Sequence, residues 1–279
     1  SGIEKSKLLE EGDSESSLKT LIKNGVFESF KILVNRIEEV PAGDIEIKLS
    51  QVQQEAFEEI KSSFEDKQTA LLQGVTGSGK TEIYIQLIQE VIASGSQVLL
   101  LLPEIALTTQ IVSRLKQVFG SQMGVYHSKY SDNERVEVWN GVISGRFPFV
   151  VGVRSSIFLP FDSLGLVIVD EEHEASYKQF DPAPRFHARD SAIMLAYLHQ
   201  AKTLLGSATP SFESYFNARG DKYGHTVLTK RYGEAQLPDF HLASLSGDKR
   251  KNLLKLDTTR LLREKIQEAL EKNEQVLIF

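Results

Sequence analysis

The chain contains no cysteine, and only two methionines and one tryptophan occur among its 279 residues. Without cysteine, this sequence forms neither a disulfide framework nor a cysteine-ligated metal site, and its six histidines lack the spacing of metal ligands. It also lacks any run of about 18 apolar residues and any basic opening followed by an apolar stretch. Neither a membrane span nor a signal peptide is predicted, and we expect a cytoplasmic protein.

The chain also lacks a strong excess of positive charge, since its formal net charge is −6. The acidity is local: residues 1–66 hold 15 acidic and 8 basic residues, whereas the rest holds 23 and 24. Basic stretches occur at residues 185–189 and 249–255, although most such runs are solvated faces. The net charge therefore does not exclude a nucleic-acid partner.

Short apolar runs alternate with helical patterns from residue 49 onward. Strands are predicted at residues 70–73, 98–102, 124–127, 149–153, 166–170 and 203–206. Helices are predicted at residues 52–64, 80–93, 106–119, 132–144 and 188–199. This alternation is typical of right-handed βαβ units, so it predicts an α/β fold with a doubly wound parallel sheet covered on both faces.

Three parts are predicted along the chain. Residues 1–48 form the tail of a small α+β domain and a linker, with a helix at 17–23 and strand-like alternation at 26–37. Residues 49–245 form the large lobe. Residues 246–279, with a helix at 261–272 and a strand at 275–279, begin a second lobe that the sequence does not complete.

The sequence GVTGSGKT at residues 74–81 fits the pattern G-x-x-x-x-G-K-T, directly after a predicted strand and before a predicted helix. Its glycines let backbone N–H groups and the helix N-terminus meet phosphate oxygens. Lys80 supplies charge to the β and γ phosphates, and Thr81 offers a hydroxyl to Mg²⁺. All eight residues are predicted to bind ATP: Gly74, Val75, Thr76, Gly77, Ser78, Gly79, Lys80 and Thr81.

The predicted strand at 166–170 ends in the acidic sequence DEEH at residues 170–173. Carboxylates at the carboxyl end of a buried parallel strand need a cation. Asp170 is predicted to bind Mg²⁺ and Glu171 to deprotonate the attacking water, so both join Lys80 as predicted catalytic residues. Gln53, upstream of the phosphate loop, is a candidate for hydrogen-bonding adenine, although a lone glutamine is more often a surface residue.

Three further stretches indicate a helicase rather than another P-loop protein. Ser207 and Thr209, in LGSATP at residues 205–210, are predicted to sense phosphate loss, and this stretch resembles the Ser-Ala-Thr motif of superfamily 2 helicases. LPEIALT at 102–108 and GVRSS at 152–156 resemble the strand-contacting motifs of that superfamily. Thr108 and Arg154 are therefore predicted to hold phosphodiester oxygens without regard to base sequence.

A narrower resemblance is to the PriA family of replication-restart DNA helicases. It is carried by GVTGSGKTEIY (74–84), LLPEIALT (101–108), VDEEHEASYKQ (169–179), PRFHARD (184–190) and LGSATPSFES (205–214). In that family, the stretch after the acidic motif forms a loop that couples single-stranded DNA to the ATPase. The matching side chains, predicted to bind DNA, are Tyr177, Lys178, Phe180, Arg185, Phe186 and Arg189. Aromatic faces stack on bases and cations hold phosphates, whereas the alternative is ordinary packing of the phenylalanines under the loop.

The resemblance implies a RecA-like first helicase lobe preceded by a winged-helix remnant. It implies an ATP-dependent 3′ to 5′ DNA helicase for replication restart and primosome assembly at stalled forks. ATP and Mg²⁺ are the implied cofactors, with zinc expected only in the second lobe. The implied partners are single-stranded and forked DNA, replication-restart proteins and single-strand-binding proteins. Because the second lobe supplies an arginine finger, we expect the isolated chain to hydrolyse little ATP.

Three alternatives remain at this stage. A kinase or GTP-driven switch would need an acceptor pocket or a base-specific motif, and neither is evident in the sequence. A double-stranded DNA translocase of the restriction or remodelling type shares the nucleotide motifs. A non-catalytic DNA-binding module would not need Glu171.

Overall fold

The computed structural model describes residues 14–29, 43, 47–104, 106, 109–127, 130–231 and 239–278. The chain forms two compact units, Ser1–Tyr232 and Gly233–Phe279. The second unit begins before the predicted limit at 245–246, and the assignment of the three predicted parts to domains stays a prediction.

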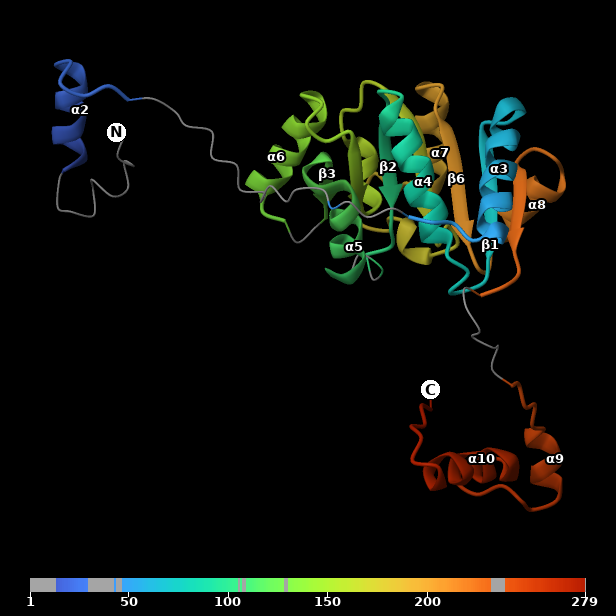
Figure 1. Cartoon of the computed structure of the whole chain (residues 1–279). Coiled ribbons are helices and arrows are strands. Elements are labelled where there is room, and N and C mark those ends of the chain that lie inside the picture. The colour runs from blue at the N-terminus through green and yellow to red at the C-terminus, as the bar shows by residue number, and fades with distance from the viewer. Residues whose placement is uncertain are drawn as a thin grey trace. The chain divides into compact units, whose positions relative to one another are not determined.

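The first unit contains a seven-stranded sheet in the order β3-β4-β2-β5-β6-β1-β7, and every neighbouring pair is parallel (Figure 1). Its strands are β1 (Thr69–Gly74), β2 (Gln97–Leu101), β3 (Met123–Tyr126), β4 (Phe149–Gly152), β5 (Leu164–Asp170), β6 (Lys202–Ser207) and β7 (Gly224–Leu228). The order of the strands and their common direction confirm the predicted α/β doubly wound sheet.

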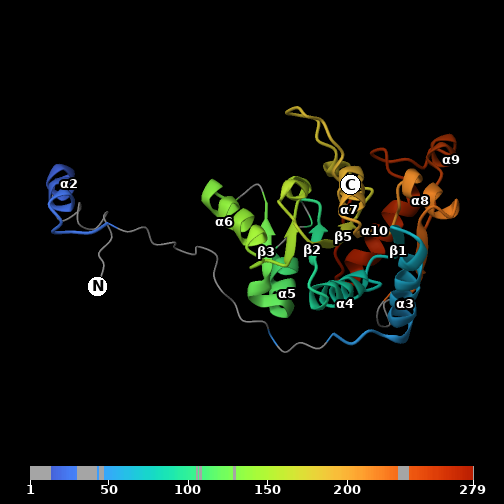
Figure 2. The same ribbon diagram turned by 90° about the horizontal axis from the view of Figure 1, so that it is seen from above.

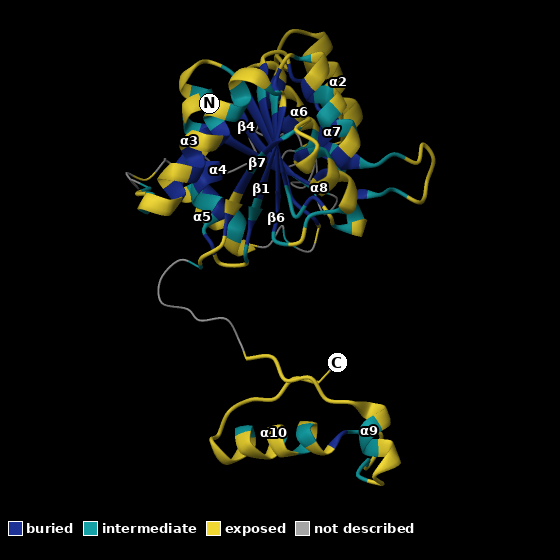
Figure 3. Ribbon diagram, turned by 90° about the vertical axis from the view of Figure 1, so that its right-hand side faces the viewer, coloured by how far each residue is buried: buried dark blue, intermediate teal, exposed yellow. Residues whose placement is uncertain are grey.

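Helices cover both faces of this sheet (Figure 2). One face carries α3 (Gln51–Asp66), α4 (Lys80–Ala93) and α5 (Thr109–Phe119), and the other carries α6 (Asp132–Ile143), α7 (Ala188–Leu198) and α8 (Phe212–Arg219). Each face buries its own apolar cluster, and Figure 3 shows the strands buried between the two helical layers. Because both faces are covered, the strands are nearly continuous apolar runs instead of alternating ones.

Polar caps fix where the helices around the loops begin. Ser50 precedes α3, and its Oγ accepts a hydrogen bond from the Gln53 amide N–H while Gln53 Oε1 accepts one from the Ser50 amide N–H. Ser131 and Glu134 form the same reciprocal pair at the start of α6. Such capping satisfies N–H groups that have no partner inside the helix.

Several predicted elements differ from the structure. The sequence patterns missed α8, β7 and the short helix α9 (Leu245–Arg250). The strand predicted at 275–279 is wrong for residues 275–278, which form no strand; Phe279 lies outside the described residues. An apolar run needs a neighbouring strand to pair with, and none lies in the described part of the second unit, which contains α9 and α10 (Arg260–Glu271).

The N-terminal segment is described only in part. Helix α2 (Glu15–Lys23) confirms the helix predicted at 17–23, and Ser14 caps it. Of the strand-like alternation predicted at 26–37, residues 26–29 form no strand and the rest lies outside the described residues. In the described ranges, every helix is too short or too polar to cross a lipid bilayer.

Phe147 offers a test of the packing on the α6 and α7 face. Its side chain is 1% exposed and packs against Gly141 of α6 and Gly124 of β3. Replacing it by alanine leaves a cavity, so Phe147→Ala is expected to lower the free energy of unfolding by about 3–5 kcal/mol. Denaturant unfolding followed by the fluorescence of Trp139 in α6, the single tryptophan, measures this change.

Phe216→Ala is the matched control for this variant. Phe216 lies in α8 with 77% of its surface exposed, so its truncation is expected to change the free energy of unfolding by less than about 0.5 kcal/mol. Equal losses in the two variants would show that Phe147 is not part of the core.

Candidate nucleotide-binding site

The phosphate loop joins β1 to α4 at the carboxyl edge of the sheet. Gly77 and Gly79 have φ values of +78° and +84°, in the left-handed region that glycine adopts without strain. Lys80 is the first residue of α4, and its Nζ donates to the Gly74 carbonyl oxygen at 3.0 Å. The loop therefore curls around the lysine, with the N-terminus of α4 facing the enclosed space.

The acidic pair lies across from this loop at the end of β5. Asp170 Oδ1 accepts a hydrogen bond from the Tyr84 hydroxyl at 2.8 Å, and Lys80 Nζ lies 3.9 Å from Glu171 Oε1. Burial raises the pKa of the Asp170 carboxyl, the hydrogen bond from Tyr84 opposes that rise, and the negative Glu171 adds to it. A cation placed beside Asp170 would favour its ionised form.

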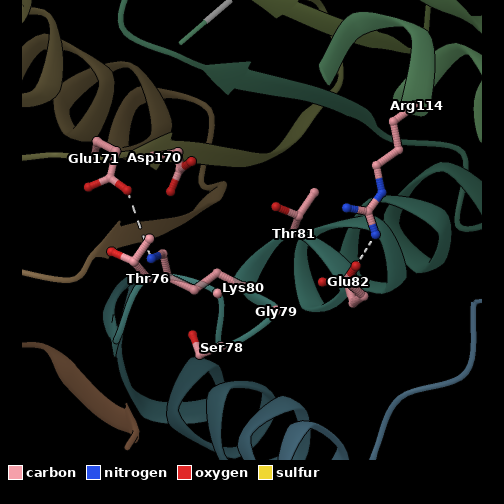
Figure 4. A pocket seen from close by; sticks show the side chains of 10 residues that line it. Thr76, Ser78, Gly79, Lys80, Thr81, Glu82, Arg114, Asp170 and Glu171 are labelled. Atoms are coloured by element: carbon pink, nitrogen blue, oxygen red, sulfur yellow. Dashed lines mark hydrogen bonds and ion pairs between the residues drawn. The ribbon is translucent and has the colours of Figure 1, made fainter. Parts of the chain in front are cut away.

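The loop and the acidic pair line one pocket of about 500 Å³. Figure 4 shows the Thr81 hydroxyl and the Asp170 carboxylate pointing into the same space as Lys80. The lining residues are Thr76, Gly77, Ser78, Gly79, Lys80, Thr81, Glu82, Arg114, Asp170 and Glu171. Most of the predicted ATP-binding residues and all three predicted catalytic residues are thus together, whereas Gly74 and Val75 precede the pocket.

The pocket fits a nucleotide triphosphate and Mg²⁺ by the chemistry of its donors. Ser78 Oγ is one of the few buried side-chain nitrogen or oxygen atoms in the described residues that have no hydrogen-bond partner. Such an atom within a glycine-rich loop suits a phosphate oxygen, because a buried hydroxyl without a partner costs about 1–3 kcal/mol. A hydroxyl and a carboxylate, from Thr81 and Asp170, are oxygen ligands of the kind that Mg²⁺ prefers.

The two predicted coupling residues contact the acidic segment through His173. The Ser207 hydroxyl shares a hydrogen bond of 2.8 Å with His173 Nδ1, and the Thr209 hydroxyl lies 3.4 Å from His173 Nε2. His173 Nδ1 is also 3.7 Å from Glu171 Oε2. One histidine therefore connects the ends of β5 and β6. The sequence analysis placed His173 in the acidic motif but predicted no role for it.

Gln53 does not present a free amide to the pocket. Its side chain is buried, 2% exposed, and its Oε1 accepts from the Ser50 amide while Nε2 donates to the carbonyl oxygens of Ser78 and Gly79 at 3.4 and 3.3 Å. A Cβ at Gly79 would overlap Gln53 Nε2. The glutamine thus holds α3 against the phosphate loop, and the adenine contact proposed for it stays a prediction.

Four of the residues predicted to bind DNA lie on the loop between Lys178 and His187. An antiparallel bridge joins these two residues, and Gln179 Nε2 donates to the carbonyl oxygens of Pro182 and Pro184. The four are Lys178, Phe180, Arg185 and Phe186. Phe180 is 69% exposed and Arg185 is exposed, and Figure 2 shows the loop projecting beside α7.

Phe186 is the half-buried member of this group. Its ring meets the exposed Phe158 ring edge-to-face, with centroids 5.1 Å apart. Phe158 ends the short helix Arg154–Phe158, which follows β4. This aromatic pair therefore joins the loop to the short helix that carries Arg154. The sequence analysis predicted no role for Phe158.

Two other residues predicted to bind DNA have buried side chains. The Tyr177 hydroxyl donates to the carbonyl oxygens of Asp170 and Leu101, at 2.7 and 3.1 Å. The Arg189 guanidinium is also buried, where it donates to Glu172 Oε2 at 2.9 Å and to Ser211 Oγ at 2.7 Å. Both groups are therefore engaged within the protein, and the DNA contacts predicted for them stay predictions.

The remaining predicted DNA contacts are only partly described. Arg154 is half-buried, and its Nη1 donates to the Ser176 carbonyl oxygen at 3.2 Å. Thr108 lies outside the described residues. The phosphate contacts of both residues stay predictions.

The structure places further residues at the pocket that the sequence analysis did not predict. Tyr84 lies four residues after Lys80 on the same face of α4, a spacing that could have revealed its place beside Asp170. Glu82 and Arg114 pair at the mouth of the pocket (Figure 4). No pattern pointed to Arg114, because its helix α5 comes near the loop only through the packing of the sheet.

Gln53→Ala tests whether this side chain braces the loop or reads adenine. Bracing acts on every triphosphate, so the affinities for ATP and ITP are expected to fall by the same factor, roughly 2- to 30-fold for the loss of one or two hydrogen bonds. Nucleotide titrations measure both affinities. Gln54→Ala, whose exposed side chain hydrogen-bonds only Glu58 among the contacts described, is the control. A loss of affinity confined to ATP would show that Gln53 contacts adenine instead.

Comparison with known proteins agrees with this geometry. The sequence pattern that describes the DEAD/DEAH box helicases matches residues 50–217, more than half of the chain. The chain is 47% identical to the replication restart protein PriA of Haemophilus influenzae over 209 residues, which are 75% of this chain and 28% of that protein. It is 40% identical to PriA of Bacillus subtilis over 277 residues, 95% of this chain and 33% of the relative.

Among solved structures, the chain resembles RecG bound to a three-way DNA junction, with a TM-score of 0.52, 24% identity, and coverage of 69% of this chain and 25% of RecG. This likeness concerns the fold. The relatives confirm the resemblance to the PriA family, and the chain spans about a third of their length. Because the family pattern matches residues 50–217, the chain belongs to the DEAD/DEAH box helicase family.

Proposed function

We propose that this chain is the nucleotide-binding lobe of an ATP-dependent DNA helicase that acts in replication restart. The observation that carries the proposal is the shared pocket of phosphate loop and acidic pair, with His173 joining Glu171 to Ser207 and Thr209. The likeness to the replication restart protein PriA supports the role in replication restart. The proposal includes 3′ to 5′ unwinding, a cytoplasmic location and primosome assembly at stalled forks. Its proposed partners are single-stranded and forked DNA, replication-restart proteins and single-strand-binding proteins.

The residues of the pocket divide the chemistry of hydrolysis. Lys80 and the loop N–H groups would hold the β and γ phosphates, and Thr81 with Asp170 would hold Mg²⁺, which neutralises charge on the phosphate oxygens. Tyr84 orients the Asp170 carboxylate through its hydrogen bond. Glu171 would take the proton of the attacking water, and Lys80 at 3.9 Å keeps that carboxylate at the phosphate end of the pocket.

The exposed loop supports single-stranded DNA as the activating ligand. Phe180 is exposed, and Lys178 and Arg185 lie on the same loop. Aromatic rings stack on any base and neighbouring cations hold phosphates, so such a surface binds single strands with little sequence preference. Unpaired bases are available only in single strands, which favours this ligand over a duplex.

Glu171→Gln tests the proposed motor in the intact protein that contains this sequence. The amide cannot accept a proton, so DNA-stimulated hydrolysis is expected to fall roughly 10²- to 10⁴-fold while ATP binding remains. Phosphate release with and without single-stranded DNA measures it. Glu174→Gln, whose carboxylate does not line the pocket, is the control. Wild-type turnover that is equally fast without DNA, or fastest with duplex, would contradict the proposal.

Phe180→Ala tests the stacking surface. Losing one base stack costs about 1–3 kcal/mol, so affinity for oligothymidine is expected to fall roughly 5- to 150-fold. Fluorescence anisotropy of a labelled oligonucleotide measures the affinity. Phe216→Ala removes a similarly exposed phenylalanine from α8 and is expected to leave the affinity for oligothymidine unchanged. Equal affinities for Phe180→Ala and wild type would remove Phe180 from the DNA surface.

A further inference from the structure

Arg114 and Glu82 form an ion pair, which we call the mouth pair, at the opening of the nucleotide pocket. Arg114 comes from α5 with 48% of its side chain exposed, and its Nη2 donates to Glu82 Oε1. Glu82 lies in the first turn of α4, three residues after Gly79. Both helices lie on the same face of the sheet, so the mouth pair connects α5 to the start of the helix that follows the phosphate loop (Figure 4).

The charges that line the pocket give the mouth pair the cation nearest the opening. Among the described lining residues, the carboxylates are Glu82, Asp170 and Glu171, and the cations are Lys80 and Arg114. Lys80 donates to a loop carbonyl oxygen and lies 3.9 Å from Glu171 Oε1, at the inner end of the pocket. A nucleotide brings several negative charges, so the outer part of its phosphate chain needs a second cation, and Arg114 is placed to supply it.

The proposed function fixes which end of the nucleotide faces the mouth pair. Thr81 and Asp170 are the proposed Mg²⁺ ligands and Glu171 is the proposed base, so the γ phosphate faces the end of β5. Figure 4 shows the mouth pair on the opposite side of Thr81 from the two carboxylates of β5. A phosphate chain that follows the first turn of α4 away from β5 therefore brings the α phosphate to the mouth pair.

Glu82 competes with a phosphate for the same surroundings. Its carboxylate lies in the first turn of α4, where the helix N-terminus attracts negative charge, and a Cβ at Gly79 would lie 3.0 Å from its Oε2. A guanidinium carries five N–H donors in a planar fork that fits a carboxylate and a phosphate equally well. In the contacts of the described residues, only Nη2 of Arg114 is engaged, and Glu82 engages it. The guanidinium can therefore exchange one anion for the other.

We infer that Arg114 binds the α phosphate of the nucleotide and that Glu82 is a positioning residue that competes for the same guanidinium. Before a nucleotide enters, the mouth pair keeps Arg114 at the pocket, and the α phosphate then replaces Glu82 as its partner. ATP and ADP share the α phosphate, so Arg114 raises the affinity for both and Glu82 lowers the affinity for both. Glu82 thereby limits how tightly the product is held. This inference rests on the proposed function, because it concerns the nucleotide of that pocket.

Arg114→Met tests the contact in the intact protein that contains this sequence, since it removes the guanidinium from a half-exposed side chain. The affinities for ADP and for the ATP analogue AMP-PNP are expected to fall by the same factor, about tenfold or more for the loss of a hydrogen-bonded charge pair. Calorimetric titration measures both. A loss confined to AMP-PNP would place Arg114 at the γ phosphate and overturn the inference, as would wild-type affinities.

Arg135→Met is the matched control for this variant. Arg135 has a similarly exposed side chain and pairs with Asp132 at the start of α6, outside the lining of the pocket. Both nucleotide affinities are expected to stay at the wild-type value. An equal loss in the two arginine variants would show that the effect of Arg114 is not specific to the pocket, which would overturn the inference.

Two nucleotide analogues separate a contact with the α phosphate from one with the base. IDP differs from ADP only in its base, so Arg114→Met is expected to lower both affinities by the same factor. ADPαS carries sulfur, a weaker acceptor, in place of one α-phosphate oxygen, and its two diastereomers differ in which oxygen is replaced. The ratio of their affinities is expected to be smaller in Arg114→Met than in wild type. A loss for ADP without one for IDP would assign Arg114 to the base and overturn the inference.

Glu82→Gln tests the competition, because the amide keeps the size of the side chain and removes its charge. The affinity for ADP is expected to rise roughly 2- to 5-fold, the size of one exposed ion pair. The ratio between the ADPαS diastereomers is expected to rise with it, since Arg114 then contacts the α phosphate more strongly. A fall in affinity would show that Glu82 only supports the fold, and a rise without the change in ratio would reflect simple repulsion; either result overturns the competition.

The failure of this inference is distinct from that of the proposed function. Affinities for ADP do not depend on hydrolysis or on DNA. Wild-type hydrolysis that responds to single-stranded DNA, together with an Arg114→Met variant of normal affinity, would keep the proposed function and overturn the inference. Hydrolysis that does not respond to DNA would overturn the proposed function, whatever the affinities of the variants.

Discussion

The common direction of the seven strands is the constraint on which the site depends. Parallel strands end at the same edge, and the register sets which ends are neighbours: Gln73 of β1 lies beside Ser207 of β6, and Gly206 lies beside Asp170 of β5. The phosphate loop, the hydroxyl motif and the acidic motif thereby become adjacent although they are far apart in the sequence. Close packing also restricts position 206 to glycine, because a Cβ there would overlap the Tyr84 hydroxyl.

Burial of this edge decides how its charged groups behave. Helices on both faces limit the access of water to the strand ends, so most charged or polar groups there have a partner within the protein. Asp170 accepts a hydrogen bond from the Tyr84 hydroxyl, and Lys80 donates one to the Gly74 carbonyl oxygen. Glu172 accepts hydrogen bonds from Arg189 and from the hydroxyls of two serines. The same low dielectric strengthens the field that these groups exert on a bound phosphate chain.

The surface loop and the buried acidic segment are two parts of one arrangement. Phe180 is exposed where a nucleic acid can reach it, whereas Tyr177 and Arg189, on either side of the loop, are buried against the strand ends. Hydrogen bonds from Tyr177 and Arg189 therefore connect the residues on either side of the loop to the acidic segment.

The sequence by itself determined the alternating fold, the phosphate loop and the acidic pair, because these depend on local periodicity and on motifs whose residues are adjacent in the chain. It did not determine β7 and α8, whose patterns are short and become stable only by packing on β1. Tertiary structure alone decided which loop side chains face solvent: Tyr177 and Arg189 match a DNA-binding pattern, yet partners distant in the fold bury them. It also decided the roles of Gln53 and Glu172, since hydrogen bonds to the phosphate loop and to α7 and α8 arise only after the chain has folded.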